Sequence, residues 1–243
     1  MSQTSGGKVD FFAADIHLSP LHPRRSERFF AFLRLVAREG RALYLLGDIF
    51  DLWLGDDIGG GFGAQVRGKL REIADGGVKV YLQHGNRDFL LGRQFAAAAG
   101  CELIGDNHII NGGILLTHGD KLDADLTYAI YRAIVRSALA RGLFGLLSSA
   151  RRKNIAAKLR TASDAKRRRP LLKPAMAERL LKRHNCQMLI HGHLHNPCDQ
   201  QWQTDGKTYR RLCLPAWEGG GEGYARVFCH DGGGEVIADM IVR

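Results

Sequence analysis

The chain of 243 residues carries a formal net charge of +10, and its 45% hydrophobic and 25% charged residues are typical of a soluble globular protein with a substantial core. The sequence shows no apolar signal region at the amino terminus and no run approaching the roughly 20 apolar residues that span a bilayer. The five cysteines are scattered and include no CxxC pair, which favours reduced thiols in a cytoplasmic protein over a disulfide framework or a zinc site.

The first half of the chain alternates apolar runs typical of buried strands with segments of helical apolar spacing. Strands are predicted over 9–15, 42–48, 78–86 and 113–120, and helices over 27–40, 63–77 and 92–100. Strands that alternate with helices predict a layered α/β-type architecture.

A basic segment without strand signal follows. Residues 122–184 contain 16 Lys/Arg and 4 Asp/Glu, so the remainder of the chain has a charge near −2. Helices are predicted over 126–160, with an interruption at 142–145, and over 175–185. Nucleic acid, an anionic membrane surface and a phosphorylated substrate are all compatible partners for such a segment.

The strand pattern returns over 186–193, 208–217 and 224–242, the last with a turn at 231–234. The simplest organisation is therefore a core of residues 1–121 and 185–243, interrupted by a helical insertion of residues 122–184. The alternative of two domains stays open at this point.

Polar side chains recur at the carboxyl ends of the predicted strands, where distant segments of layered α/β folds converge. They are Asp15, His17, Asp48, Asn86, His118, His193 and His195. Imidazole, carboxylate and amide oxygen together suit Mn, Fe, Zn or similar divalent ions. Seven ligands exceed what one tetrahedral ion needs, and they fit two ions that share a bridging carboxylate.

Each position also has a structural interpretation. Asp15 and Asp48 are of the type that caps a following helix, and Asn86 beside Gly85 is of the type that adopts a left-handed turn. The histidines in 189–197, "LIHGHLHNP", would share a face if the strand continued, but the glycine and proline predict that it ends there.

Five short motifs in fixed order resemble the calcineurin-like metallophosphoesterase superfamily. They are Asp-x-His at 15–17, Gly-Asp at 47–48, Gly-Asn-x-Asp at 85–88, His-Gly-Asp at 118–120 and Gly-His-x-His at 192–195. The longer stretches "YLLGDIFDLWLGDD" and "QHGNRDFLLG" are similar to the UDP-2,3-diacylglucosamine hydrolase family of lipid A biosynthesis.

The resemblance implies an α+β fold, a four-layer α/β/β/α sandwich with a helical cap at 122–184. It also implies hydrolysis of the diphosphate of a lipid-linked nucleotide sugar by water activated at two divalent metal ions, most fittingly Mn²⁺. The implied ligands are Asp15, His17 and His195 on one ion and Asn86, His118 and His193 on the other, with Asp48 bridging. Arg87 would grip the phosphate in the transition state, together with Asn86 and His193. His191 would support the ligands by packing or hydrogen bonding.

In the cap, the family implies substrate contacts at matching positions, namely Asp125, Tyr128 and Ser163. The family's asparagine and lysine after that serine are replaced here by Arg167 and Pro170, and Lys166 or Arg169 would supply the lost cation. This departure keeps open an alternative, a related phosphoesterase that acts on another lipid-linked or nucleotide diphosphate. A third class, a binding module without catalysis, predicts broken ligands, and none is broken.

Within the insertion, residues 138–160 place apolar side chains on one face and basic ones on another. Such a helix either lies on the anionic cytoplasmic face of the inner membrane or packs its apolar face on the core. The run "KRRR" at 166–169 lacks interleaved aromatic residues, which argues against nucleic acid as a partner. No feature of the sequence predicts an oligomeric state.

Overall fold

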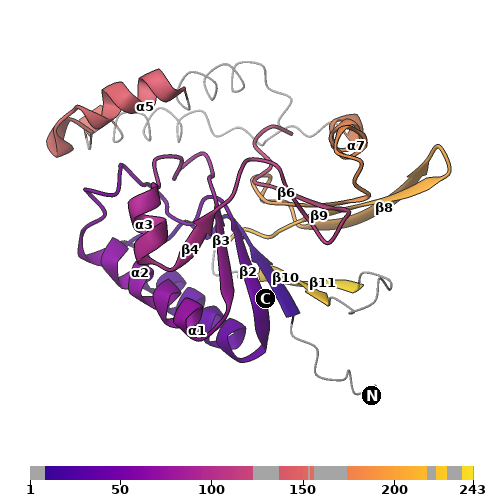
Figure 1. The fold of residues 1–243 in the computed structure, drawn as a ribbon, viewed down its shortest axis with the longest axis horizontal. Helices are drawn as coiled ribbons and strands as arrows, with labels where there is room; N and C mark the ends of the chain where they lie inside the picture. The colour runs from indigo at the N-terminus through magenta and orange to yellow at the C-terminus, as the bar shows by residue number, and fades with distance from the viewer. Residues whose placement is uncertain are drawn as a thin grey trace.

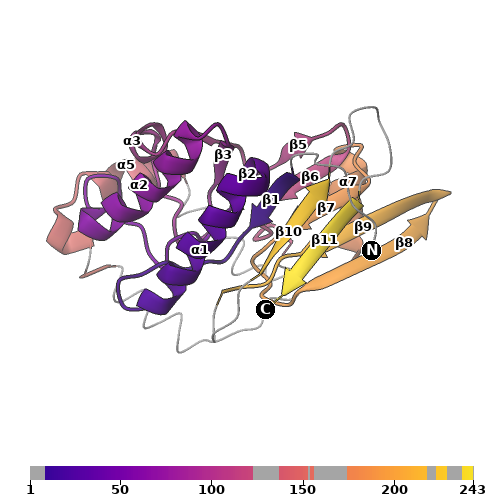
Figure 2. The same ribbon diagram turned by 90° about the horizontal axis from the view of Figure 1, so that it is seen from below.

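The computed structural model describes residues 9–122, 137–152, 154–155, 174–217, 223–228 and 237–242. Two β-sheets lie face to face, and helices cover their outer faces (Figures 1 and 2). Among the described helices, none combines the length and apolar character needed to cross a membrane.

The first sheet has six strands in the order β11-β10-β1-β2-β3-β4. Their bounds are β1 Val9–Ala13, β2 Gly40–Leu46, β3 Lys79–Gln83, β4 Cys101–Leu103, β10 Gly223–Phe228 and β11 Ile237–Val242. Strands β1 to β4 run parallel, and β10 pairs antiparallel with β1. The crossovers between the parallel strands contain α1 Pro23–Glu39, α2 Gly60–Asp75 and α3 Arg93–Ala98.

The second sheet has five strands in the order β5-β6-β7-β9-β8. Their bounds are β5 His108–Ile110, β6 Ile114–Thr117, β7 Met188–His191, β8 Cys198–Thr204 and β9 Lys207–Cys213. The central strands β6, β7 and β9 are parallel, while β5 and β8 are antiparallel edges. Helix α7 (Pro174–Arg183) covers the outer face, and α5 (Ala138–Gly145) lies toward α2 and α3 in both views (Figures 1 and 2).

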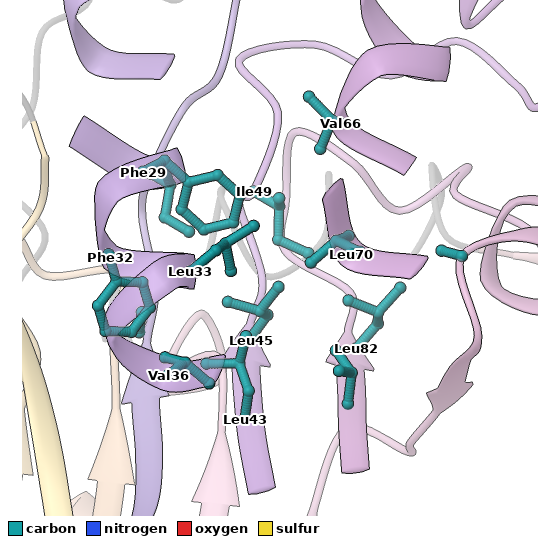
Figure 3. Packing of buried hydrophobic residues seen from close by; sticks show 14 of the residues in the cluster. Phe29, Phe32, Leu33, Val36, Leu43, Leu45, Ile49, Val66, Leu70 and Leu82 are labelled. Atoms are coloured by element: carbon teal, nitrogen blue, oxygen red, sulfur yellow. The ribbon is translucent and has the colours of Figure 1, made fainter. Parts of the chain in front are cut away.

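Helix α1 forms because its apolar residues fall on one face. Phe29, Phe32, Leu33 and Val36 are spaced at three and four residues and are buried against strand β2, for example at Leu45 (Figure 3). Pro23 occupies the first turn, where its missing N–H has no intrahelical role. Each fully buried side chain of this size stabilises the fold by roughly 1.5–3 kcal/mol.

The alternation of side chains in β1 explains the stacking of the sheets. Phe11 belongs to the cluster under α1 and α2, whereas Phe12 belongs to the cluster between the two sheets, with Ile190 of β7. A third cluster joins α7 to the outer face of the second sheet through Leu181 and Leu189. The predicted four-layer sandwich is confirmed.

The structure differs from the sequence prediction in four places. Strands β4, β5 and β8 were not predicted, because β4 and β5 have only three residues each and β8 reads as the polar run "CDQQWQT". Pairing with β9 makes β8 a strand despite that composition. The helix break predicted at 142–145 lies at 146–148. The division of the chain into core and insertion stays a prediction.

Candidate metal centre

The seven predicted ligands all lie just beyond the carboxyl ends of strands from both sheets. They are Asp15 and His17 after β1, Asp48 after β2, Asn86 after β3, His118 after β6, and His193 with His195 after β7. Parallel strands end at a common edge, so side chains from distant parts of the chain meet there. The structure brings all seven together.

The backbone of this region is unusual. Five of the seven residues have positive φ: 52° at Asp15, His17 and Asp48, 68° at His193 and 51° at His195. Three other non-glycine residues in the described part of the chain have positive φ, and all eight are Asn, Asp or His, the types that adopt this conformation most readily. Five of the eight are predicted ligands, so this uncommon backbone conformation is concentrated at the candidate site, as is common at functional sites.

Asp15, His17 and His195 form a first cluster, with ligand atoms all within 4.8 Å of one another. His195 Nε2 lies 3.4 Å from both Asp15 Oδ1 and His17 Nε2. Burial would raise the pKa of Asp15, but the hydrogen bond with His195 and the charges of neighbouring histidines outweigh it and hold that pKa well below its usual range. Burial lowers the pKa of His17 to about 3. Carboxylate and neutral imidazole are the forms that bind a metal.

Asn86, His118 and His193 form a second cluster. Asn86 Oδ1 lies 3.1 Å from His118 Nε2 and 3.0 Å from His193 Nδ1. His118 Nδ1 donates a hydrogen bond to the carbonyl oxygen of Leu46 at 2.9 Å. In the neutral ring this leaves Nε2 without a proton and able to bind a metal.

Asp48 lies between the two clusters. Its Oδ2 is 3.9 Å from His17 Nε2, and its Oδ1 is 3.8 Å from His118 Nε2. Burial, with the charges of Asp88 and Asp15, raises the pKa of Asp48 well above its usual value. A buried carboxylate beside two others is stabilised in its ionised form by a nearby cation. The site therefore fits divalent metal ions.

The main chain around Asp48 is held by the Gly-Asn-x-Asp motif. The buried carboxylate of Asp88 accepts hydrogen bonds from the N–H groups of Asp48 (3.2 Å), Ile49 (2.7 Å) and Gly85 (2.8 Å). The N–H of Arg87 donates to Asp48 Oδ1 at 2.8 Å. A Cβ at Gly85 would overlap the Asp48 carboxylate and main-chain nitrogen, so only glycine fits there.

Arg87 lies at the rim of the site. Its side chain is 30% exposed, and its Nη1 is 3.6 Å from Asp51 Oδ1. The carbonyl of Arg87 accepts the N–H of Trp53 at 3.1 Å. The Trp53 ring packs on Phe50 and Phe95, with ring centroids 4.5 and 5.0 Å away, so it lies in the core beneath the loop. The guanidinium is accessible to an anion that enters from solvent.

His191 lies outside both clusters. Its ring is fully buried at the end of β7, where Nδ1 donates to the carbonyl of Gly192 at 2.8 Å. Burial lowers the pKa of His191 to about 3, so the ring is neutral. These contacts confirm a packed, hydrogen-bonded side chain.

Arg152, which no sequence motif marks, ties the insertion to the loop after β2. Its Nη1 donates to the carbonyl of Leu54 at 3.0 Å and to Asp57 Oδ1 at 2.9 Å, while Nη2 donates to Asp57 Oδ2. Its Nε donates to the carbonyl of Leu147 at 3.1 Å. In the sequence Arg152 is one of many basic residues, and nothing local marks it.

The predicted cap contacts lie outside the described residues. They are Asp125, Tyr128, Ser163, Lys166 and Arg167. Their role in binding stays a prediction.

Comparison with known proteins gives concordant matches. A family model described as calcineurin-like phosphoesterase matches residues 11–197, a span that contains all seven predicted ligands. The UDP-2,3-diacylglucosamine hydrolase of Ectopseudomonas mendocina is 38% identical over 214 residues, which cover 84% of this chain and 88% of that protein. The enzyme of the same name from Pseudomonas aeruginosa is 38% identical over a match that covers 85% of this chain and 90% of that protein. The enzyme of the same name from Vibrio cholerae is 36% identical over a match that covers 85% of this chain and 89% of that protein.

Proposed function

The chain belongs to the calcineurin-like phosphoesterase family and is a metal-dependent phosphoester hydrolase, and we propose that its substrate is UDP-2,3-diacylglucosamine. The products would be 2,3-diacylglucosamine 1-phosphate and UMP. The observation that carries this substrate is the match of 36–38% identity over 84–85% of the chain to relatives of that name.

We assign the two clusters to two metal ions. Asp15, His17 and His195 would hold one ion and Asn86, His118 and His193 the other, with Asp48 between them. The two carboxylate oxygens of Asp48 face different clusters: Oδ2 lies 3.9 Å from His17 Nε2, and Oδ1 lies 3.8 Å from His118 Nε2. This arrangement supports a bridging role for Asp48. The donor set, four imidazoles with two carboxylates and one amide oxygen, is compatible with Mn²⁺. When bound, such a pair supplies an activated water and a clamp on phosphoryl oxygens.

The protein's own groups orient the substrate. Arg87 offers two parallel donors to a phosphate, and its charge persists at every working pH. Asp51, 3.6 Å from the guanidinium, holds that side chain beside the site. Asn86 and His193 would also contact the diphosphate. The insertion at 122–184 would act as a cap, with Asp125, Tyr128, Ser163, Lys166 and Arg167 on the nucleotide and acylated sugar.

The described part of the insertion supports binding to the cytoplasmic face of the inner membrane. Leu143, Leu146 and Ile155 are 58%, 84% and 38% exposed, and Arg151 beside them is exposed too. Apolar and basic side chains exposed together suit an anionic lipid surface, where a substrate with two acyl chains resides. Replacing Leu143 and Leu146 by serine should reduce flotation with phosphatidylglycerol vesicles. Leu21→Ser should not, because Leu21 is exposed on residues 1–121, outside the insertion. Equal flotation of all three proteins would contradict membrane binding through this surface.

The substrate is tested by incubating the manganese-loaded protein with UDP-2,3-diacylglucosamine and measuring UMP. We expect UMP and the lipid monophosphate in equal amounts, with release stopped by a chelator and restored by Mn²⁺. No UMP from protein that still hydrolyses a small phosphodiester would overturn this substrate. Turnover confined to another lipid-linked or nucleotide diphosphate would instead select the alternative, which the altered segment at 164–170 motivates.

A further inference from the structure

A second cluster of reactive side chains lies beside the metal centre, on strands β8 and β9. Cys198, the first residue of β8, directly faces Cys213, the last residue of β9. Arg211 is two residues before Cys213, so it projects from the same face of the sheet. Cys213 is fully buried and Arg211 is only 6% exposed.

The guanidinium of Arg211 has a sulfur atom as its partner. Its Nη2 donates to Cys198 Sγ at 2.9 Å. Within the described ranges Arg211 makes no ion pair with a carboxylate, and its buried Nε has no hydrogen-bond partner there. A buried cation without an anion is unstable, because desolvation is not compensated. The thiolate form of Cys198 supplies the missing anion.

The electrostatics of the two thiols are complementary. The hydrogen bond from Cys213, followed by the charge of Arg211, lowers the pKa of Cys198 to about 6 against the effect of burial. The same hydrogen bond and burial raise the pKa of Cys213. Burial raises the pKa of Cys101 to about 12 and also raises that of Cys186. The two shifts favour the thiolate at Cys198 and the thiol at Cys213.

We propose that Cys198 and Cys213 form a dithiol site that hydroperoxides oxidise to a disulfide, with Arg211 holding Cys198 as the attacking sulfur. Facing residues of antiparallel strands have Cα atoms about 4.5–5.5 Å apart, within the span of roughly 4.4–6.8 Å that disulfides bridge. The register of β8 and β9 therefore suits a disulfide between these two residues.

The chemistry balances in two steps. The Cys198 thiolate attacks the terminal oxygen of the hydroperoxide and the O–O bond breaks, which gives a sulfenic acid. The leaving group is hydroxide from hydrogen peroxide, or alkoxide from an organic hydroperoxide. The Cys213 sulfur then attacks the Cys198 sulfur, the S–O bond breaks, and water leaves with the Cys213 proton. Two thiols are oxidised by two electrons, and one hydroperoxide is reduced.

The position of the bond links it to the metal centre. Residues 192–197 leave β7 and enter β8, and they carry His193 and His195. Cys213 is the register neighbour of His191 at the end of β7. A disulfide would therefore fix the β8 end of this loop to the strand that lies between β7 and β8. The site does not depend on which phosphoester the protein hydrolyses.

The test treats the full-length reduced protein with hydrogen peroxide at pH 7 and maps its peptides by mass spectrometry. We expect a Cys198–Cys213 disulfide, and iodoacetamide should alkylate Cys198 at least about tenfold faster than Cys101 or Cys186. Absence of that disulfide, pairing of Cys198 with any other cysteine, or equal alkylation rates would each overturn the proposal.

Variants assign the roles of the three residues. Cys213→Ser should leave Cys198 as a sulfenic acid that dimedone traps, and Cys198→Ser should abolish both trapping and disulfide. Arg211→Met should slow alkylation of Cys198 about tenfold. The matched control is Arg210→Met, because Arg210 pairs instead with Asp199 at 2.7 Å. Equal alkylation rates of Cys198 in the two arginine variants would contradict the role of Arg211. If a variant fails to fold, peptide mapping of the unaltered protein still shows whether the disulfide forms.

Discussion

The loops that carry the metal centre and the described part of the insertion are held in place by different means. In the loops, the main chain fixes the side chains, through left-handed residues such as His17 and His193 and through hydrogen bonds to Asp88. In the insertion, the polar contacts with the loop after β2 that lie within the described ranges all come from one side chain, Arg152. Short motifs can encode the first kind of site, whereas the second depends on partners almost a hundred residues away.

Removing the charge of Asp48 should have the largest effect. In Asp48→Asn the shape is kept, but both clusters lose the carboxylate between them, so turnover of a small phosphodiester should fall about 1,000-fold. Turnover and bound metal are measured together. Asp199→Asn, which removes only an exposed partner of Arg210, should retain full activity. Near-normal turnover of Asp48→Asn would refute the central place of this residue.

Gly85→Ala tests whether the main chain is as decisive as the ligands. Its Cβ would overlap the Asp48 carboxylate and nitrogen, so the loop must shift and turnover should fall roughly 100-fold with every ligand present. Gly105→Ala is the matched control, because a Cβ there meets no atom within 4 Å. If both variants are equally active, the close approach of Gly85 to Asp48 does not contribute to catalysis.

His191→Leu tests the buried ring that supports the ligand loop. The pKa of His191 is lowered to about 3 by burial, whereas an unfolded chain binds the proton near pH 6.5. The unfolded state therefore holds more protons between these values, and stability falls as pH falls. From pH 7 to pH 5 the metal-free protein should lose about 2 kcal/mol more than His191→Leu, measured by urea unfolding. Parallel pH profiles would show that the ring titrates normally.

The sequence predicts the features that local motifs encode better than those that depend on long-range contacts. That the seven predicted ligands lie close together could be predicted, because each follows a strand with a strong apolar pattern and belongs to a short motif. The left-handed backbone at five of the seven could not, because most aspartates and histidines adopt ordinary conformations even though these types are enriched in the left-handed one. Strand β8 was missed because its pairing with β9, not its own composition, makes it a strand. Arg152 was missed because its partner Asp57 is 95 residues away, and no local pattern reports such a contact.

Breaking the Arg152 contact should have the smallest effect and the most selective one. Arg152→Gln removes the ion pair with Asp57, which joins the insertion to the loop after β2. That loop contacts Arg87, because the N–H of Trp53 donates to the Arg87 carbonyl oxygen. KM for the lipid-linked substrate should rise about tenfold, with kcat and the turnover of a small phosphodiester nearly unchanged.

The control for that variant is Arg38→Gln, because Arg38 is an exposed arginine at the end of α1, outside the insertion. Exchanging the charges, with Arg152→Asp and Asp57→Arg together, should recover part of the loss, since the pair and not either residue alone carries the effect. If both substrates lose activity equally in Arg152→Gln, the contact stabilises the whole protein and does not position the insertion. A selective rise in KM would instead show that a single long-range side chain sets how the insertion meets the substrate, while the metal centre below it remains intact.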